Sequence, residues 1–123
     1  MTARSADARR RGALIEQRAA QWLMARGLAL IASNQHAKGG ELDLIMRDGD
    51  TLVFVEVRHR ASSRHGHPLE TITPQKQRRL IRAARFYLHR NGLSCLCRFD
   101  VLAVTGPLHQ LEYEWVTNAF EAF

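Results

Sequence analysis

The first periodic pattern along the chain has the spacing of a helix. Four apolar residues share one helical face at the i, i+4, i+7 and i+8 positions: Ile15, Ala19, Trp22 and Leu23. Gly27 follows as a stop signal, so the pattern predicts a helix from about residue 8 to 26. Residues 1–8 are rich in Ser, Ala, Arg and Asp, and we expect them to form a flexible arm.

Runs with the character of strands follow this helix. A short apolar run at residues 28–32 predicts a strand, and a polar loop is expected at residues 34–40. Two β-rich runs, residues 41–47 and 51–60, then flank an Asp-Gly-Asp turn at residues 48–50. Asp-Gly between two such runs predicts a β-hairpin.

A second helix is predicted after a loop at residues 62–72. Thr73 supplies an N-cap hydroxyl, and Pro74 suits the first helical position. An Asn-Gly pair ends this helix after about Arg90.

Two further strands complete the predicted sheet. Residues 98–105 predict one strand, and residues 112–116 predict a last strand at the sheet edge. The order αβββαββ predicts one α/β domain over residues 9–123, with a mixed β-sheet flanked by helices.

The size and composition of the chain agree with a single domain. A chain of 123 residues with 46% hydrophobic residues can bury a core without disulfides or a structural metal. Cys95 and Cys97 are separated by a single residue, and we expect both thiols to be reduced rather than joined in a disulfide. Reduced thiols, with no apolar leader and no membrane-spanning run, predict a soluble cytoplasmic protein.

The formal net charge is +6, and one segment carries it. Residues 58–90 contain nine Lys or Arg and one acid, whereas the rest of the chain has nine Lys or Arg and eleven acids. This excess predicts a polyanionic partner, with nucleic acid favoured over an anionic membrane.

The helix predicted at residues 74–90 concentrates this charge on one side. An apolar stripe of Leu80, Ile81, Ala84, Tyr87 and Leu88 lies opposite four arginines, Arg78, Arg79, Arg82 and Arg85. A solvated face normally mixes both signs of charge, but no acid lies between Thr71 and Asn91, so we favour a phosphate-binding face. Gln77 lies on the apolar side and is a candidate polar site residue.

The hairpin brings two acids together. Asp43 and Glu56 share a face of the sheet with either a two-residue or a four-residue loop, and the four-residue register sets them directly opposite each other. A three-residue loop without a bulge would separate them. Opposed carboxylates among apolar neighbours repel each other, so this arrangement needs compensation.

Two kinds of compensation fit these residue types. A divalent cation such as Mg²⁺ takes oxygen ligands, commonly one or two carboxylates completed by water and phosphate oxygens. An ion pair between Glu56 and Arg58, or across the strands, is the purely structural alternative. Glu16 lies on the inward face of the first helix and would join the site if that helix crosses the acids.

Four motifs stand in a defined order along the chain. They are Gly40-Glu41-Leu42-Asp43-Leu44-Ile45, Phe54-Val55-Glu56-Val57-Arg58, Thr73-Pro74-Gln75-Lys76-Gln77 and Arg98-Phe99-Asp100-Val101. In order and spacing they resemble the YraN family of uncharacterised bacterial proteins. That family is similar to the PD-(D/E)XK nuclease superfamily, near the archaeal Holliday-junction resolvases.

The resemblance implies a restriction-endonuclease-like core that hydrolyses structured or branched DNA, with a two-fold dimer that would place two sites on two strands. Asp43 and Glu56 would hold Mg²⁺ or Mn²⁺, with Glu16, Arg58 and Gln77 as further catalytic residues. The superfamily signature ends in Lys, whereas Arg58 is too basic to give up a proton near pH 7. The expected nucleic-acid contacts are Arg60, Lys76, Arg78, Arg79, Arg82 and Arg85.

Three functions stay open. We favour a metal-dependent endonuclease over a non-catalytic nucleic-acid-binding module of the same fold. An adaptor whose arginine face binds an acidic protein is the third class, and a steep salt dependence of DNA binding would argue against it.

Overall fold

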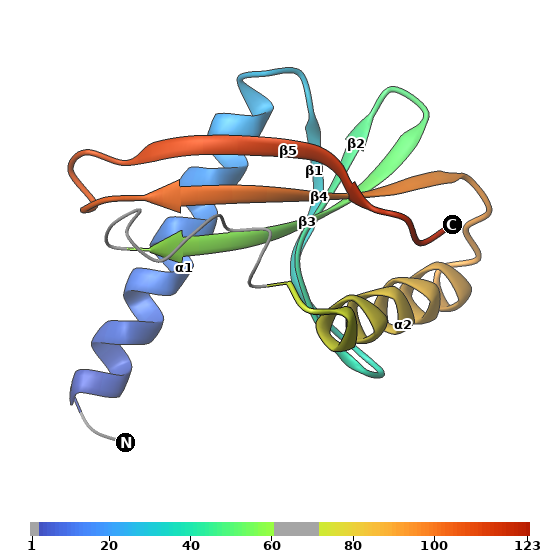
Figure 1. Ribbon diagram of the computed structural model, residues 1–123, viewed down its shortest axis with the longest axis horizontal. Helices are drawn as coiled ribbons and strands as arrows, with labels where there is room; N and C mark the ends of the chain where they lie inside the picture. Colours follow the sequence, from blue (N-terminus) through green and yellow to red (C-terminus); the bar gives the residue numbers. More distant parts are fainter. Residues whose placement is uncertain (1–2, 61–71) are drawn as a thin grey trace.

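A computed structural model describes residues 3–60 and 72–123 of the chain (Figure 1). The elements in chain order are α1 (Ala3–Met24), β1 (Ala29–Ala37), β2 (Gly40–Asp48), β3 (Thr51–Arg60), α2 (Pro74–Arg90), β4 (Leu96–Thr105) and β5 (Glu112–Phe120). This order confirms the predicted α/β class and the succession αβββαββ. Of the loop expected at residues 62–72, only Ile72 lies in the described part of the chain.

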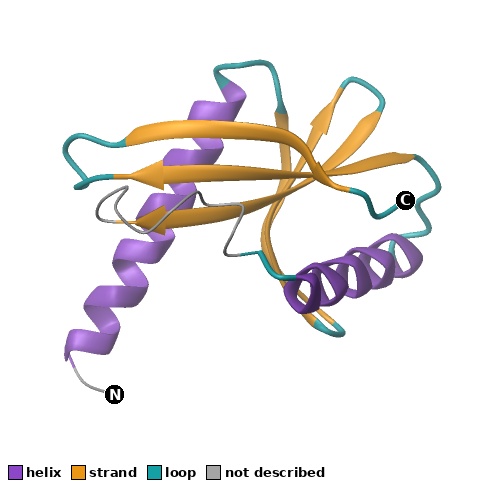
Figure 2. Cartoon of the chain, viewed as in Figure 1, coloured by secondary structure: helices purple, strands orange, loops and turns teal. Residues whose placement is uncertain are grey.

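The five strands form one mixed sheet in the spatial order β1-β2-β3-β4-β5 (Figure 2). Neighbouring strands are antiparallel, except that β3 and β4 run parallel. A parallel pair needs a crossover connection, and α2 is part of it. The last strand, β5, lies at the sheet edge as predicted and continues to Phe120.

The sheet separates two apolar cores. One core joins α1 to the sheet through Ile15, Ala19, Leu23, Leu44, Val55 and Leu102. The other joins α2 to the sheet through Ile45, Phe54, Leu80, Ala84, Phe99 and Val101. Strand alternation explains the split, because the consecutive residues Leu44 and Ile45 point to opposite faces. The two helices therefore approach the middle strands from opposite sides.

The start of α1 differs from its prediction. The helix begins at Ala3, so part of the segment expected to be a flexible arm is helical. Ala and Arg are good helix formers, and Arg10 pairs with Asp7 across one turn at 2.7 Å. Neither α1 nor α2, the two helices of the described residues, is long and apolar enough to cross a membrane.

The strand β1 extends into the segment predicted to be a loop, so that prediction was wrong. It runs to Ala37 and pairs with β2 as far as Gly40, which leaves Lys38 and Gly39 as the turn. Its polar side chains are largely exposed on an edge strand, which hides the strand from a pattern based on burial. Asn34 has a φ of 51°, a left-handed conformation that Asn tolerates.

The predicted start and end of α2 are confirmed. The Oγ1 atom of Thr73 accepts a hydrogen bond from the N–H of Lys76 at 3.2 Å, Pro74 opens the helix, and Asn91 caps its end. An N-cap of this kind stabilises a helix by about 1 kcal/mol. The cap fixes where α2 starts and so places Lys76 in its first turn.

The β2–β3 hairpin adopts one of the two registers that bring the acids to one face. Its pairing follows the four-residue register and continues to Leu44 opposite Val55. The next position in this register sets Asp43 opposite Glu56. The paired part of the hairpin ends one position before the acids, and the Asp43 and Glu56 side chains lie close enough to interact.

A buried carboxylate ties three strands together at the other end of the sheet. Asp100 on β4 is fully buried and accepts hydrogen bonds from Arg98 at 3.0 and 3.2 Å, from the indole of Trp115 at 2.9 Å and from the N–H of Asn118 at 2.9 Å. These donors satisfy the charge, which is the condition for burying it. Arg98 also donates to Asp48 at 3.0 Å, which links the network to β2.

Candidate functional site

Asp43 lies where β2 separates from β3. Beyond the last pair, Leu44 with Val55, its Oδ2 atom accepts a hydrogen bond from the backbone N–H of Val57 at 2.9 Å. In a continuous ladder a backbone carbonyl of β2 would accept such an N–H, so the carboxylate has taken the place of the carbonyl. The carboxylate is therefore held in the seam between the strands, within reach of side chains from both faces.

Glu56 is the neighbouring acid on β3, and only 7% of its surface is exposed. Burial, and next the charge of Asp43, raise the pKa of its carboxyl to about 7. Two cations oppose this shift, because the Nζ of Lys76 lies 3.5 Å and the Nε of Arg58 lies 3.9 Å from the Oε1 of Glu56. The pKa of Glu56 stays raised even with both cations in place.

Glu16 reaches Asp43 from α1, on the other side of the sheet. Its side chain is half-buried and shares a hydrogen bond with Asp43. Burial, and next the charge of Asp43, raise the pKa of Glu16 to about 7, whereas a hydrogen bond with the side chain of Asn34 lowers it. The first helix thus crosses the acids, which is the condition for including Glu16 in the site.

Asp43 links two acids that come from opposite sides of the sheet. Carboxylate oxygens are suitable ligands for a hard divalent cation, and a bound cation would remove the cost of keeping like charges together. Within residues 3–60 and 72–123, no three His, Cys, Asp or Glu side chains are arranged to hold a metal ion. Asp43 and Glu56 are the two donors that the sequence predicts for Mg²⁺ or Mn²⁺, and two carboxylates would leave positions for water and phosphate oxygens.

Lys76, in the first turn of α2, has different surroundings from those expected, whereas its neighbour Gln77 lies on the inward side of the helix as predicted. The sequence places Lys76 among the nucleic-acid contacts, but its ammonium group faces Glu56. Gln77 is half-buried, and its Nε2 donates to the carbonyl of Ile72 at 3.1 Å. Its amide nitrogen therefore holds the chain just before the helix.

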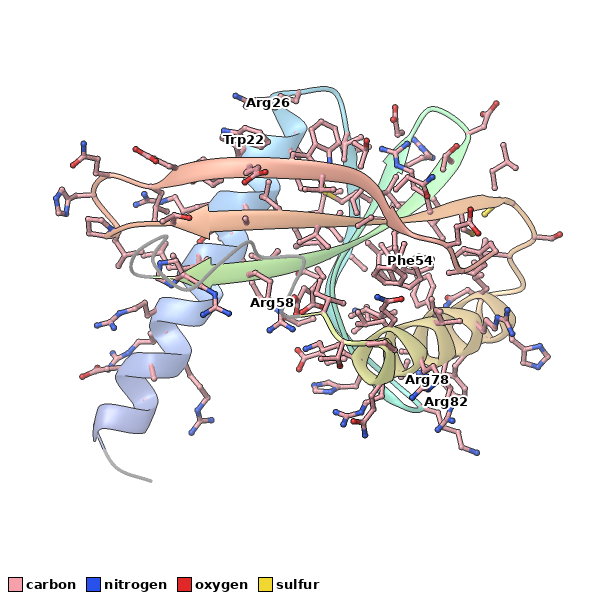
Figure 3. All side chains as sticks on the ribbon, viewed as in Figure 1. Trp22, Arg26, Phe54, Arg58, Arg78 and Arg82 are labelled. Carbon is pink, nitrogen blue, oxygen red and sulfur yellow. The ribbon has the colours of Figure 1, made fainter. Side chains whose placement is uncertain are left out.

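Arg58 and Arg60 follow Glu56 along β3. Arg58 is half-buried beside the acid (Figure 3). Arg60 is the last residue of the strand, and its carbonyl accepts the N–H of Gly106 at 2.9 Å. Arg58 thus belongs to the acid site, while a phosphate contact by Arg60 stays a prediction.

The arginine face of α2 is turned outward. All four predicted members are exposed: Arg78, Arg79, Arg82 and Arg85. Figure 3 shows Arg78 and Arg82 pointing away from the sheet. The stem of Arg82 packs on the β1–β2 turn, where a Cβ at Gly39 would come within 2.9 Å of its Cδ. Arg85 instead donates to the carbonyl of Ala122 near the chain end, at 3.4 Å.

Asn34 is a site residue that the sequence pattern does not reveal. It is predicted to lie in a loop, but it interrupts β1 with a positive φ and its side chain hydrogen-bonds Glu16. A left-handed polar residue within an edge strand gives no periodic signal. Only the docking of α1 beside β1 gives Asn34 its place in the site.

One family profile covers most of the chain. The profile described as "Uncharacterised protein family UPF0102" matches residues 15–104. This range contains Glu16, Asp43, Glu56 and Lys76, so the whole acid site lies inside the matched region.

Individual relatives extend the similarity beyond this range. The UPF0102 protein of Chromohalobacter salexigens is 68% identical over 117 residues, which make up 95% of this chain and 95% of the relative. The UPF0102 proteins of Herminiimonas arsenicoxydans and Klebsiella pneumoniae subsp. pneumoniae are each 49% identical, over 90% and 85% of this chain and 86% and 81% of their own lengths. The chain therefore belongs to the uncharacterised protein family UPF0102, the YraN family that its motifs resemble.

Proposed function

We propose that the protein is a metal-dependent endonuclease that hydrolyses phosphodiester bonds in DNA. The observation that carries this proposal is the pair of Asp43 and Glu56, two acids held together where burial and like charge work against ionisation. Folding gains nothing from this pairing, because a carboxyl with a raised pKa destabilises the folded chain when it ionises. Such costly groups are typical of catalytic and metal-binding sites.

Several residues of the chain have defined roles in this proposal. Asp43 and Glu56 hold the cation, and the N–H of Val57 fixes the orientation of Asp43. When bound, Mg²⁺ or Mn²⁺ supplies an electrophile that acidifies water and neutralises charge on the phosphate. Glu16 positions Asp43 from the opposite face and exchanges a proton near neutral pH, where its pKa lies.

Two cations complete the site beside Glu56. Arg58 binds phosphate oxygens through its planar guanidinium but does not release a proton near pH 7. The superfamily signature has a lysine where this chain has Arg58, and Lys76 brings an amine to the site from α2 instead. Its contact with Glu56 supports a role as a second cation beside that acid, with Gln77 holding the start of α2 in place.

The charge of α2 supports DNA as the partner. Arg78, Arg79 and Arg82 are exposed on one side of the helix. Like charges at i+3 and i+4 weaken a helix by a few tenths of a kcal/mol per pair, a cost that a phosphate backbone reverses. The resolvase resemblance favours structured or branched DNA, a two-fold dimer and a cytoplasmic location without a membrane partner.

One observation favours a second function. Lys76 and Arg58 already give Glu56 two cationic partners, so the fold can tolerate this acid without metal chemistry. The protein would then be a non-catalytic nucleic-acid-binding module that uses the arginine face of α2. The third class, an adaptor that binds an acidic protein, would use the same arginine face. Unlike the binding module, it would bind DNA weakly at every salt concentration.

Metal titration combined with cleavage assays tests the proposal. Purified protein is titrated with Mn²⁺ and Mg²⁺ by calorimetry, and then incubated with linear, single-stranded and four-way-junction DNA. We expect metal binding and cleavage, and Asp43→Asn should lose both. Asp50→Asn makes the same change in the exposed β2–β3 turn and should keep both.

Two outcomes would reject the nuclease. One is the absence of metal binding at millimolar concentrations, and the other is cleavage that persists in Asp43→Asn. Salt-sensitive DNA binding without metal binding or cleavage would support the binding module instead.

A further inference from the structure

A cleft opens beside the acids, between the N-terminal half of α1 and the end of β3. Its volume is about 250 Å³, space for roughly eight water molecules. The residues that line it include Arg11, Gly12, Glu16, Val57 and His59. Val57 donates its N–H to Asp43, and Glu16 shares a hydrogen bond with the same acid. The inner end of the cleft therefore adjoins the proposed metal site.

The outer end of the cleft is cationic. Arg11 lies one helical turn before the buried Ile15, so it continues the inward stripe of α1 beyond the edge of the core. Figure 1 shows this half of α1 projecting past the sheet. His59 lines the same cleft from β3. A hydrogen bond of 3.0 Å between its Nε2 and the carbonyl oxygen of Gly106 fixes the ring.

Gly12 leaves the wall of the cleft without a side chain. Glycine inside a helix costs roughly 0.5–1 kcal/mol relative to alanine. A Cβ at Gly12 would meet nothing within 4 Å, so packing does not require glycine here. The missing side chain leaves the helix backbone open to close approach from the cleft.

We infer that this cleft binds a backbone phosphate of the DNA strand, next to the phosphate at the acids. The inference rests on the proposed nuclease and adds a phosphate site on α1. Arg11 is the main ligand, because a guanidinium matches the geometry of phosphate oxygens. Glu16, about 7.5 Å further along the axis of α1, repels the phosphate from the inner end and directs it to Arg11. The bound strand therefore extends along α1 from the acids.

A matched pair of charge substitutions tests this site. Arg11→Gln removes the proposed ligand, and Arg9→Gln removes the same charge from an exposed position on the opposite side of α1. Both are made in Asp43→Asn, so that bound DNA stays uncut. Fluorescence anisotropy of a labelled DNA duplex, in EDTA and over a range of KCl concentrations, measures binding.

We expect Arg11→Gln to weaken binding about fivefold and to lower the slope of log affinity against log salt by about 0.9, the value of one phosphate contact. Arg9→Gln should lower the DNA affinity and the salt slope less than Arg11→Gln does. Any general effect of removing one positive charge appears equally in the two variants, so the difference between them isolates the cleft.

A second pair separates binding from folding. Gly12→Glu places a carboxylate in the cleft, and Glu is a better helix former than Gly, so the melting temperature should not fall. Its DNA binding should weaken at least as much as that of Arg11→Gln. Ala13→Glu adds the same charge at the next exposed position of α1 and should weaken binding less.

Three results would overturn the inference. They are equal losses in Arg9→Gln and Arg11→Gln, undiminished binding in Gly12→Glu, and a lack of duplex binding in Asp43→Asn itself. These assays contain no divalent metal. A failure of the nuclease proposal would appear separately, as absent metal binding or absent cleavage.

Discussion

The carboxylate of Asp43 accepts the backbone N–H of Val57 at 2.9 Å, at the point where β2 leaves β3. Asp43 therefore has a structural task beside its proposed chemical one, and two substitutions separate them. Asp43→Asn keeps an oxygen acceptor for Val57 and removes the charge that raises the pKa of Glu16 and Glu56. Asp43→Ala leaves the N–H without this acceptor, at a cost of about 1–2 kcal/mol.

We expect Asp43→Asn to be at least as stable as the natural protein at pH 8. Asp43→Ala should be less stable than Asp43→Asn by about 1–2 kcal/mol. Both variants should lose metal binding. Urea unfolding in EDTA measures the first effect, and calorimetric metal titration measures the second. Equal stability of the two variants would show that the hydrogen bond to Val57 contributes nothing to folding.

Glu56 should make the folded protein less stable as the pH rises. Its pKa is raised from 4.5 to about 7, chiefly by burial and then by the charge of Asp43. The folded chain thus holds this proton more tightly than the unfolded chain. The resulting stability is fully present below about pH 4.5 and is lost as the pH rises through about 7.

Replacing Glu56 by a neutral isostere should remove this dependence. We expect Glu56→Gln and the natural protein to be similarly stable near pH 4.5, and Glu56→Gln to be more stable at pH 8, by on the order of 2 kcal/mol. Urea unfolding at a series of pH values in EDTA provides the measurement. A natural protein that is the more stable of the two at pH 8 would contradict this account, because Lys76 and Arg58 would then outweigh burial.

The fold could be predicted largely from local signals. Thr73 and Pro74 mark the start of α2, and its one-sided apolar stripe marks the packed face, because both are properties of neighbouring residues. Alternation also predicted that Asp43 and Glu56 lie near each other, as they do. The extension of β1 was missed, because its stability comes from hydrogen bonds to β2 that a pattern of exposed polar residues does not indicate.

The rest of the site depends on how elements dock, which local patterns do not encode. Glu16 belongs to it only because α1 crosses the seam beside Asp43. The sequence predicts Lys76 as one of several cations on a basic helix, but the docking of α2 on the sheet brings its ammonium group to Glu56. Asn34 joined the site through a left-handed conformation in an edge strand.

Lys76 should control the ionisation of Glu56. Its ammonium group lies 3.5 Å from the Glu56 Oε1 and lowers the pKa of that acid, so Lys76→Met should raise the pKa further. Lys76→Arg keeps the charge and should change the pKa less. Carbon-13 NMR titration of the Glu56 carboxyl in EDTA measures this shift directly. An unchanged midpoint in Lys76→Met would show that the contact has no electrostatic effect.

Asp100 should prove essential for folding and unimportant for metal binding. Asp100→Asn replaces an acceptor oxygen by a donor NH₂ among donors from Arg98, Trp115 and Asn118. It also leaves the Arg98 guanidinium without its buried counter-charge. We expect a loss of about 3 kcal/mol in the free energy of unfolding, since breaking a buried ion pair from one side costs about 3–5 kcal/mol.

The opposite end of the same network provides the control. Asp48 bonds Arg98 at 3.0 Å but has half of its side chain exposed, so Asp48→Asn should cost less than about 1 kcal/mol. Guanidinium unfolding followed by tryptophan fluorescence compares the two variants, and metal affinity is measured on the fraction that is folded. If Asp100→Asn weakens metal binding while folded, the Arg98–Val101 motif acts on the acid site and not only on the sheet. Unchanged affinity, with the large loss of stability, would assign this motif to the joining of β2, β4 and β5 alone.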